Sequence, residues 1–476
     1  MNDFADAVDL PTELGTMDTL LHRGEANPRT RSGILGVQIL DSTPDWARFR
    51  ARFETASRRV VRLRQKVVMP TLPTTSPRWV VDPDFNLDYH VRRLRVPGPG
   101  TLREVLDIAE PYIQSPLDIS RPLWSATLVE GMANGQAAMV LHMSHAVTDG
   151  MGGVELFRHL YDFERDPHST PAPPLPVPQE LSANELMWHG VNRLPGAILG
   201  GVRVAANLLG HAIRRPGATV DGLANYARTL ARLATPPAEP SPLLNRRSLT
   251  SRSQAIDMDL AHLRMAGKAA DGSINDAYLA AMSGALRCYH EALGVPIDTL
   301  PLGVPVSLRS ESDAAGGNRF TGVNLAAPIA EPDPALRIKL IRAQMTQKLE
   351  EAAVDVFAPI APVLSIMPTP VLDALSGAVT PADVQASNVP FYPGDVYVAG
   401  AKMLRQYGLG PLPGVAMMVV LVSLGSTCCV TVRYDRAAVT DDALFARCLQ
   451  DGFDEVLALT GDPAARCTPA SFGTAA

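Results

Sequence analysis

A proline-rich segment, DPHSTPAPPLPVP (residues 166–178), interrupts the sequence about a third of the way along the chain. Its six prolines lack the backbone N–H that a helix or a central strand needs, so neither element can continue through it. A chain of 476 residues is also too long for one ordinary hydrophobic core. We therefore predict two domains, residues 1–165 and 248–476, joined by a linker and helical connection over residues 166–247.

The composition and charge of the chain narrow the classes of function. Hydrophobic residues make up 46% and charged residues 19%, a balance typical of a globular protein with a large core. The net charge of -6 leaves no basic excess to neutralise phosphates, so we predict no nucleic-acid partner. The acidic start, MNDFADAVDL, lacks the basic flank and apolar run of a secretory signal, and we expect a cytoplasmic protein.

One uncharged stretch, VAMMVVLVSLGSTCCVTV (residues 415–432), is long enough to suggest a membrane-spanning helix. Gly425 and Ser426 stand between two β-branched runs, however, which is typical of a hairpin. We therefore predict two paired strands and no transmembrane span. The five cysteines show no CxxC spacing, and we expect them to be reduced and mostly buried.

Strand-like and helix-like stretches alternate in both parts of the chain, which predicts an α/β fold. Thr101 and Glu104 form a capping-box pattern at the start of one helix, and Ser273 marks the start of another. The expected strands lie at residues 34–40, 124–130, 137–143 and 300–309, and the expected helices at 45–68, 101–114 and from 273 onward.

The stretch MVLHMSHAVTDGMGGVELF (residues 139–157) carries the strongest chemical signal. Alternate residues of a strand share a face, so His145 would extend the apolar row of Met139, Leu141 and Met143. A neutral imidazole, whose reference pKa is about 6.5, can remove a proton from an alcohol held beside it. On these residues alone, a structural histidine in a polar turn is the alternative interpretation.

Other kinds of catalytic site have less support. His142 lies on the opposite strand face from His145, and no carboxylate partner is in view, so we predict no metal site. No serine stands in a GxSxG elbow, which argues against a hydrolase nucleophile. The phosphate-binding patterns GxGxxG and GxxxxGKS are also absent from the sequence.

Several stretches together resemble the motifs of the bacterial wax ester synthase/diacylglycerol acyltransferase family. SHAVTDG resembles its HHxxxDG motif and RPLW its PLW element, while Asn275-Asp276 resembles its ND motif and SNVP (residues 387–390) its SNVPGP block. PVSLR (residues 305–309) and GGNRF (residues 316–320) fit as well. The order and spacing agree over roughly residues 10–460.

The resemblance implies a fold and a reaction. It implies two chloramphenicol-acetyltransferase-like domains whose mixed sheets meet along a central tunnel. Acyl-CoA would enter from one face and a lipid alcohol from the other, with no cofactor or metal. His145 would deprotonate the hydroxyl of diacylglycerol or of a long-chain alcohol, which would attack the thioester without a covalent acyl-enzyme.

The same resemblance assigns roles around His145. Asp149 would fix the motif loop, with Arg309 as its candidate salt-bridge partner. The residues expected near the substrate are Gly150, Asn275, Ser387 and Asn388. Ordinary structural roles remain open for these: Asn275 could tie down a helical turn, and Ser387 and Asn388 could form a plain turn. Trp124 is expected to be a core aromatic residue.

The sequence departs from the family pattern at two positions. Ser144 replaces the first histidine of the motif, and a serine can hydrogen-bond locally but cannot act as a base at neutral pH. Phe391 stands where the family often has glycine after SNVP, which could narrow the substrate wall. These changes leave open an acyltransferase for another hydroxyl or amine, or a lipid-binding relative without turnover. The helix-prone residues 183–233 could also contact a membrane or lipid-droplet surface.

Overall fold

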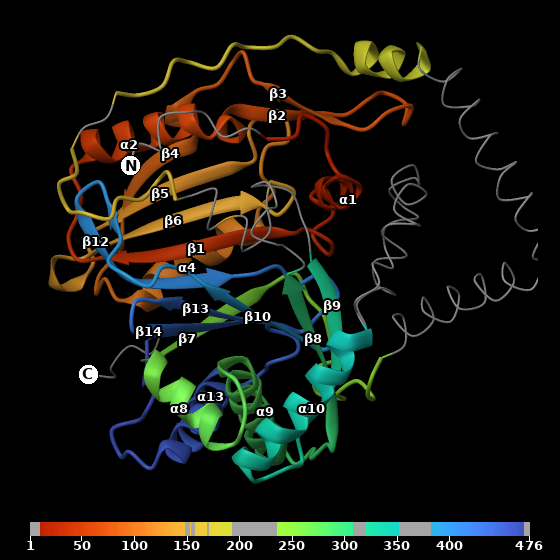
Figure 1. The fold of residues 1–476 in the computed structure, drawn as a ribbon, viewed down its shortest axis with the longest axis vertical. Coiled ribbons are helices and arrows are strands. Elements are labelled where there is room, and N and C mark those ends of the chain that lie inside the picture. Colours follow the sequence, from red (N-terminus) through yellow and green to blue (C-terminus); the bar gives the residue numbers. More distant parts are fainter. Residues whose placement is uncertain are drawn as a thin grey trace, which may run out of the picture.

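The computed structural model describes residues 10–147, 153, 158–168, 171–192, 236–307, 320–351 and 382–470 of the chain. Two large mixed β-sheets, each covered by its own helices, form the body of this part of the molecule (Figure 1). The two-domain α/β architecture predicted from the sequence is confirmed.

The N-terminal sheet has six strands in the order β11-β12-β1-β6-β5-β4. Phe49 and Phe53 of α2 pack with Leu141 of β6, whereas Val105 of α4 packs with Val140. Since adjacent strand residues point to opposite faces, α2 and α4 cover opposite sides of this sheet. Its elements are α1 (Thr16–Gly24), β1 (Gly33–Leu40), α2 (Trp46–Arg59), α3 (Leu87–His90), β4 (Val91–Arg95), α4 (Leu102–Gln114), β5 (Trp124–Glu130), β6 (Ala137–Ser144), β11 (Tyr397–Val398) and β12 (Ala401–Leu409), beside a hairpin of β2 (Gln65–Val68) and β3 (Arg78–Val81).

Local sequence rules predict most of these elements. The expected capping box of Thr101 and Glu104 is present at the start of α4, and β5 and β6 pair antiparallel as expected. The single helix expected over residues 45–68 is wrong, because α2 ends at Arg59 and a 3-10 turn, Val61–Arg64, leads into β2. Valines near this exit favour extended structure, since β-branched side chains lose rotamer freedom in a helix.

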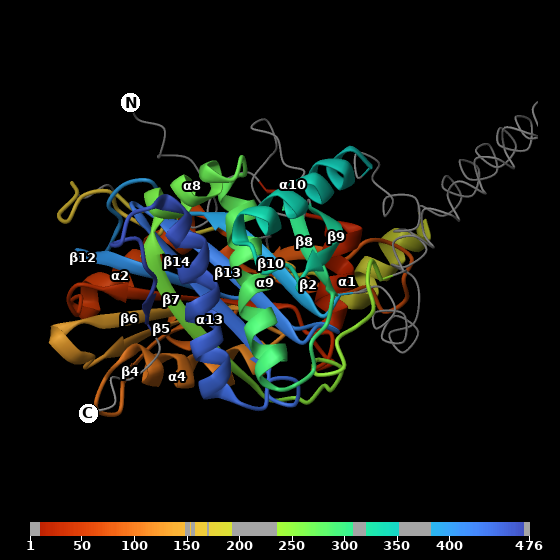
Figure 2. The ribbon, with the colours of Figure 1, turned by 90° about the horizontal axis from the view of Figure 1, so that it is seen from below.

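The C-terminal sheet has seven strands in the order β15-β7-β14-β13-β10-β8-β9. Its helices gather on one face, where α9 and α13 lie side by side (Figure 2). The elements are β7 (Ser251–Asp259), α8 (Leu260–Ala269), α9 (Ile274–Ala292), β8 (Thr299–Ser307), β9 (Phe320–Pro328), α10 (Pro334–Glu351), β10 (Val384–Pro390), β13 (Met417–Leu424), β14 (Thr427–Asp435), α13 (Asp442–Leu457) and β15 (Thr468–Pro469).

The uncharged stretch of residues 415–432 lies in the centre of this sheet. Strands β13 and β14 pair antiparallel around the turn at Gly425, whose φ of 57° is the left-handed conformation that glycine adopts without strain. The predicted hairpin is confirmed. Within the described ranges, no helix is both long and apolar enough to cross a bilayer.

Two strands of the C-terminal half, β11 and β12, belong to the N-terminal sheet. Strand β12 comes from the C-terminal half but pairs with β1 in the N-terminal sheet, with Gly36 opposite Gly408 and Gln38 opposite Gln406 (Figure 1). The N-terminal sheet therefore contains strands from beyond residue 165. The domain limits drawn from the sequence remain a prediction, and this sheet is completed by a segment outside the first of them.

A buried polar cluster joins α4 to the C-terminal sheet. The Arg433 guanidinium lies 3.5 Å from the Glu110 carboxylate, and both side chains are about 7% exposed. Ser251 Oγ donates to Glu110 Oε2 at 2.6 Å, Ser253 Oγ donates to Oε1, and Arg433 Nη1 donates to the Gly410 carbonyl at 3.0 Å. Because each charge is paired and hydrogen-bonded, the cluster can remain in a contact that excludes water.

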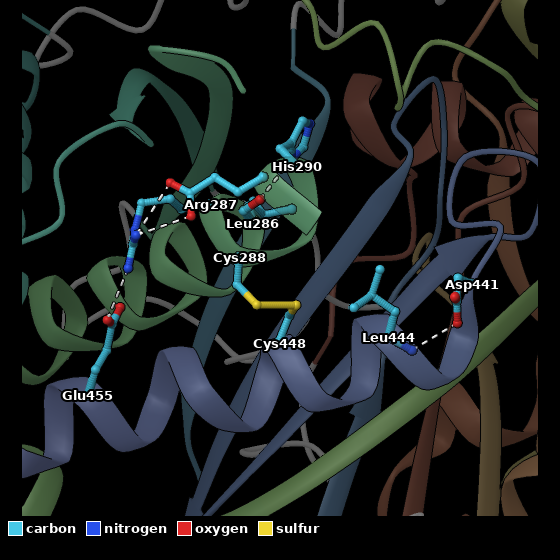
Figure 3. The surroundings of a disulfide bond; sticks show 9 residues. Leu286, Arg287, Cys288, His290, Asp441, Leu444, Cys448 and Glu455 are labelled. Carbon is cyan, nitrogen blue, oxygen red and sulfur yellow. Dashed lines mark hydrogen bonds and ion pairs between the residues drawn. A yellow bond between two sulfur atoms is a disulfide. The ribbon is translucent and has the colours of Figure 1, made fainter. Parts of the chain in front are cut away.

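A disulfide joins Cys288 of α9 to Cys448 of α13 (Figure 3). The expectation that all cysteines are reduced is therefore wrong for this pair, while Cys428, Cys429 and Cys467 are free and buried. The cysteines lie 160 residues apart in sequence but only 5.4 Å apart between Cα atoms. The two helices bring them together, which no local spacing pattern could indicate.

The disulfide gives the first prediction. Reduction should lower the free energy of unfolding by about 2–4 kcal/mol, because the bond restricts the unfolded chain. We expect dithiothreitol to lower the denaturant midpoint of the wild-type protein and to leave that of the Cys288→Ser, Cys448→Ser double variant unchanged. Equal wild-type midpoints with and without reductant, together with alkylation of both cysteines before reduction, would contradict the bond.

The Glu110 cluster gives a second prediction. Arg433→Met should destabilise the protein by about 3–5 kcal/mol, because it leaves the Glu110 carboxylate buried without its cation. Adding Glu110→Gln removes that lone charge, so the double variant should be more stable than Arg433→Met alone. Denaturant unfolding followed by circular dichroism measures both. A double variant less stable than the single variant would show that the ion pair does not dominate this contact.

Candidate functional site

His145 lies in a tight turn directly after β6. Its backbone N–H donates to the Ser32 carbonyl at 3.3 Å, and the Val147 N–H donates to the Ser144 carbonyl at 3.1 Å. The residue is half-buried. The backbone that carries the candidate base is thus bonded to neighbouring elements and is positioned at the end of a buried strand.

Ser144, at the position of the first motif histidine, is fully buried. Its hydroxyl donates to Glu25 Oε1 at 2.8 Å and accepts the Ala146 N–H at 3.2 Å. The second contact is the side-chain turn that serines commonly form with the residue two positions later. The local hydrogen bonding expected of this serine is confirmed.

Glu25 is a residue of this region that sequence reasoning missed. It caps the C-terminus of α1, is 1% exposed, and also accepts a hydrogen bond from Ser32 Oγ at 3.2 Å. Burial raises the pKa of its carboxyl group, while the hydrogen bonds from Ser144 and Ser32 oppose that rise. It precedes Ser144 by 119 residues, so no local motif could reveal the contact.

His142 lies on the opposite face of β6 from Met143 and is nearly fully buried. Burial, together with the nearby charges of Arg433 and Arg31, lowers the pKa of its imidazole to about 4. Its Nε2 atom has no hydrogen-bond partner. Across the parts of the chain that are described, no three His, Cys, Asp or Glu side chains gather as metal ligands.

Gly408 brings the sheets together on the Met143 face. In β1, Ile34 and Gly36 share this face, since they pair with Met143 and Leu141 of β6. Gly408 of β12 pairs with Gly36, and a Cβ atom at Gly408 would lie only 2.8 Å from Val420 Cγ1 of β13. The missing side chain therefore allows the C-terminal sheet to approach this closely.

The facing surface of the C-terminal sheet is apolar. Met418, Val420 and Val422 form a small cluster with Val389 of β10, apart from the core under the helices. Ser387 shares this surface, because it pairs with Val420 in register. The surface thus offers an apolar lining with the Ser387 hydroxyl beside Val420.

Asn388 and Asn275 lie toward the helical side of the same sheet. Asn388 follows the alternation of Val384 and Ala386, which pack under the helices. Asn275 is half-buried in the first turn of α9, where Ser273 and Asp276 form a capping box. Asp276 therefore supports the helix start as expected, with its carboxylate accepting the Ser273 N–H at 2.8 Å.

Tyr278 connects these two motifs. Its hydroxyl, from the second turn of α9, donates to the Ser387 carbonyl at 3.3 Å. The ND and SNVP segments are thereby brought together, whereas His145 belongs to the other sheet. Asp149, Gly150 and Arg309 lie outside the described residues, so the expected salt bridge and the expected backbone approach stay predictions.

Phe391 packs into an aromatic group beside this region. Its ring contacts Tyr161 edge-on at 5.4 Å and Tyr392 at 4.6 Å between centroids. Gln38 Nε2 donates to the Tyr161 hydroxyl at 2.6 Å, which fixes the tyrosine against β1. Phe391, which stands where the family often has glycine, therefore connects the SNVP segment to the N-terminal sheet through Tyr161.

Trp124 is a core residue, as expected. It is 1% exposed, and its ring stacks on those of Phe53 at 5.8 Å and His90 at 4.7 Å. Its indole N–H donates to the Leu63 carbonyl at 2.8 Å. The RPLW element thus anchors β5 in the core of the N-terminal half.

Comparisons with known proteins agree with the motifs. The family model of the wax ester synthase/diacylglycerol acyltransferase catalytic domain matches residues 6–278, and that of the family's C-terminal domain matches residues 316–457. A Mycobacterium tuberculosis H37Rv protein, whose name assigns it diacylglycerol O-acyltransferase activity, is 65% identical over 100% of this chain and 97% of its own length. A second protein of that strain with the same assignment is 31% identical, covering 72% and 76%.

Solved structures show the same fold. The wax ester synthase/diacylglycerol acyltransferase of Marinobacter aquaeolei VT8 superposes with a TM-score of 0.65 at 20% identity, over 95% of this chain and 100% of that one. The starter condensation domain of rhizomide synthetase, solved with C8-CoA and Leu-SNAC, superposes with a TM-score of 0.56 at 15% identity, over 99% and 97%.

The family models cover both halves of the sequence, and the first relative matches it from end to end. The resemblance drawn from the motifs is therefore confirmed. The chain is an acyltransferase that belongs to the wax ester synthase/diacylglycerol acyltransferase family.

Proposed function

We propose that this acyltransferase transfers a fatty acyl group from coenzyme A to the hydroxyl of diacylglycerol, and also to long-chain alcohols. The products are triacylglycerol and wax esters. The observation that carries this proposal is the placement of His145, half-buried in a bonded turn at the end of β6. The 65% identity to a relative named for diacylglycerol acylation favours that acceptor.

His145 acts as the general base of this reaction. Its imidazole takes the hydroxyl proton while the acceptor oxygen forms a bond to the thioester carbonyl carbon. The carbon–sulfur bond then breaks, and the proton passes from the imidazolium to the departing coenzyme A thiolate. General-base help of this kind contributes about 10²- to 10⁴-fold in rate.

Positioning supplies the remaining acceleration. Reacting groups held in the right geometry avoid much of the entropy cost of a bimolecular encounter. The apolar surface of Met418, Val420 and Val422 suits the aliphatic chains of both substrates. We propose that the substrate tunnel runs along this surface, with acyl-CoA entering from one side and the alcohol from the other.

The remaining family motifs take supporting roles. We propose that Ser387 contacts the substrate from the surface facing β1, and that Asn275 and Asn388 contact it from the ND and SNVP segments, which the hydrogen bond from Tyr278 to the Ser387 carbonyl brings together. Asp149, Arg309 and Gly150 lie outside the described residues, and for them we propose the roles that the family motif implies: a salt bridge between Asp149 and Arg309 that fixes the motif loop, and a backbone contact of Gly150 with the reacting carbonyl. The substrates make the protein a candidate for peripheral contact with a membrane or a lipid droplet.

Ser144 and Phe391 keep a second acceptor in consideration. Both depart from the family pattern, and Phe391 packs on Tyr161 beside the SNVP segment. An enzyme with the same base could then acylate a different hydroxyl or an amine. The third reading, a lipid-binding relative without turnover, requires binding of acyl-CoA with no acceptor-dependent product.

An acceptor assay separates these readings. Purified protein is given radiolabelled palmitoyl-CoA with diacylglycerol, with hexadecanol, with a long-chain amine or with no acceptor. We expect labelled triacylglycerol and wax ester, each dependent on its acceptor. Labelled amide alone would replace the proposed acceptor, and binding without any product would leave only the lipid-binding reading.

Substitution of His145 tests the assigned base. His145→Ala should lower turnover by about 10²- to 10⁴-fold, because no other group takes the hydroxyl proton. The matched control is His262→Ala, which removes an imidazole that lies 3.5 Å from Asp462 in the C-terminal half. The control should keep full activity. Activity of folded His145→Ala close to that of the wild type would exclude His145 as the base.

Substitution of Phe391 tests its effect on acceptor choice. Phe391→Gly removes the ring beside Tyr161 and should widen this part of the site. We expect the activity ratio of bulky diacylglycerol to slender hexadecanol to rise about 5- to 150-fold, because hydrophobic pocket changes are typically worth about 1–3 kcal/mol. An unchanged ratio in the folded variant would place Phe391 away from the acceptor path.

A further inference from the structure

We propose that Glu25 is a positioning residue for His145 and that it acts as a hydrogen-bond acceptor through Ser144 and Ser32. The inference rests on the proposed role of His145 as the base. It assigns a function to a buried carboxyl group that lies outside every motif discussed above.

Two separate paths lead from Glu25 to His145. In the first, Ser144 Oγ donates to Glu25 Oε1 at 2.8 Å, and the same hydroxyl accepts the Ala146 N–H at 3.2 Å. In the second, Ser32 Oγ donates to the same carboxyl oxygen at 3.2 Å, and the Ser32 carbonyl accepts the His145 N–H at 3.3 Å. Glu25 Oε1 therefore accepts hydrogen bonds both from Ser144, which precedes His145, and from Ser32, whose carbonyl accepts the His145 N–H.

The surroundings make these contacts specific. Glu25 is 1% exposed, Ser32 2% and Ser144 0%, so water does not compete for their hydrogen bonds. Loss of the acceptor would leave two buried hydroxyls unsatisfied, which costs more than an exposed hydrogen bond is worth. The turn would then relax toward other geometries.

Arg31 keeps the Glu25 backbone in place. Its Nε atom donates to the Glu25 carbonyl at 3.1 Å, and its Nη1 atom donates to the Gln114 carbonyl at the end of α4. The guanidinium thus contacts the backbone of Glu25, while the carboxyl group serves the two serines. Burial raises the pKa of this carboxyl group and the positive charge of Arg31 acts to lower it, so Arg31 supports Glu25 while the two serines donate to it.

The position of Ser144 takes on a defined role in this arrangement. The family motif places a histidine there, and this chain places a small hydroxyl that fits fully buried beside a carboxyl group. A serine donates its single proton to Glu25 and accepts the Ala146 N–H with the same oxygen. The serine that replaces the motif histidine is therefore hydrogen-bonded to Glu25, the residue that caps α1.

Kinetics of three variants test the proposal. Glu25→Leu and Ser144→Ala should lower kcat by about 10- to 100-fold with little change in the KM for acyl-CoA, since the base is displaced but the acyl surface is intact. Glu25→Gln keeps an acceptor oxygen and should retain most of the activity. The matched control is Ser283→Ala, which removes an equally buried hydroxyl that bonds the Leu279 carbonyl within α9.

A measurement without turnover separates this inference from the proposed reaction. Protein labelled at histidine Cε1 is compared by NMR, with the His145 resonance identified by its loss in His145→Ala. The resonance should move in Glu25→Leu and Ser144→Ala and stay near its wild-type position in Glu25→Gln. His290, whose ring lies beside Ser241 and the Leu286 carbonyl, should not move in any of them.

The outcomes are distinct. Wild-type protein that forms no ester while the His145 resonance responds would refute the proposed reaction and leave the positioning role standing. An unmoved His145 resonance and a kcat within twofold of wild type in Ser144→Ala would overturn the inference. This variant removes a single oxygen atom, so it keeps the test open if Glu25→Leu fails to fold. Loss of activity in Glu25→Gln equal to that in Glu25→Leu would also overturn it.

Discussion

The open edge of β12 is the constraint on which the arrangement of the two sheets depends. Beyond its short pairing with β11, this strand has β1 on one side only, so its outer backbone groups need other partners. The C-terminal sheet contacts this edge with polar groups: Arg433 of β14 donates to the Gly410 carbonyl directly after β12, and Arg405 and Tyr407 of β12 donate to the Asp257 carboxylate of β7. The two sheets are therefore held together by polar groups as well as by apolar contact.

This contact divides the C-terminal sheet's inner face into two regions of different chemistry. Beside α4, the paired charges of Glu110 and Arg433 fill the contact with a fixed polar cluster. On strands β10 and β13, the face carries valines and Ser387, and Val420 lies against Gly408 of β12. His142 lies on the charged side, where burial and the charges of Arg433 and Arg31 lower the pKa of its imidazole to about 4. The alternation of side chains along β6 places the buried neutral His142 on the opposite face from His145, which follows three residues later.

Short-range rules predict the elements that depend on neighbouring residues. The capping boxes at Thr101 and Ser273 and the hairpin at Gly425 follow from contacts within a few positions. The pairing of β1 with β12, the Cys288–Cys448 disulfide and the Glu25 contact join residues more than a hundred positions apart. No periodicity encodes such contacts, because they arise only after both sheets have formed. The resemblance to the family motifs identified His145, Ser387 and Asn275 as candidate site residues without using these long-range contacts.

The difference between motif and mechanism is clearest at Ser144. The family motif has a histidine at its first position, yet here the position is a buried serine whose hydroxyl donates to Glu25 and accepts the Ala146 N–H. A base is useful only where its ring is kept within about 0.5 Å of the productive geometry, and that demand falls on the backbone of the turn. Any side chain that bonds both the acceptor in α1 and the Ala146 N–H can meet it. If His145 is the base, as we propose, the second motif position requires an imidazole to take the proton, whereas a serine at the first position can still hold the turn.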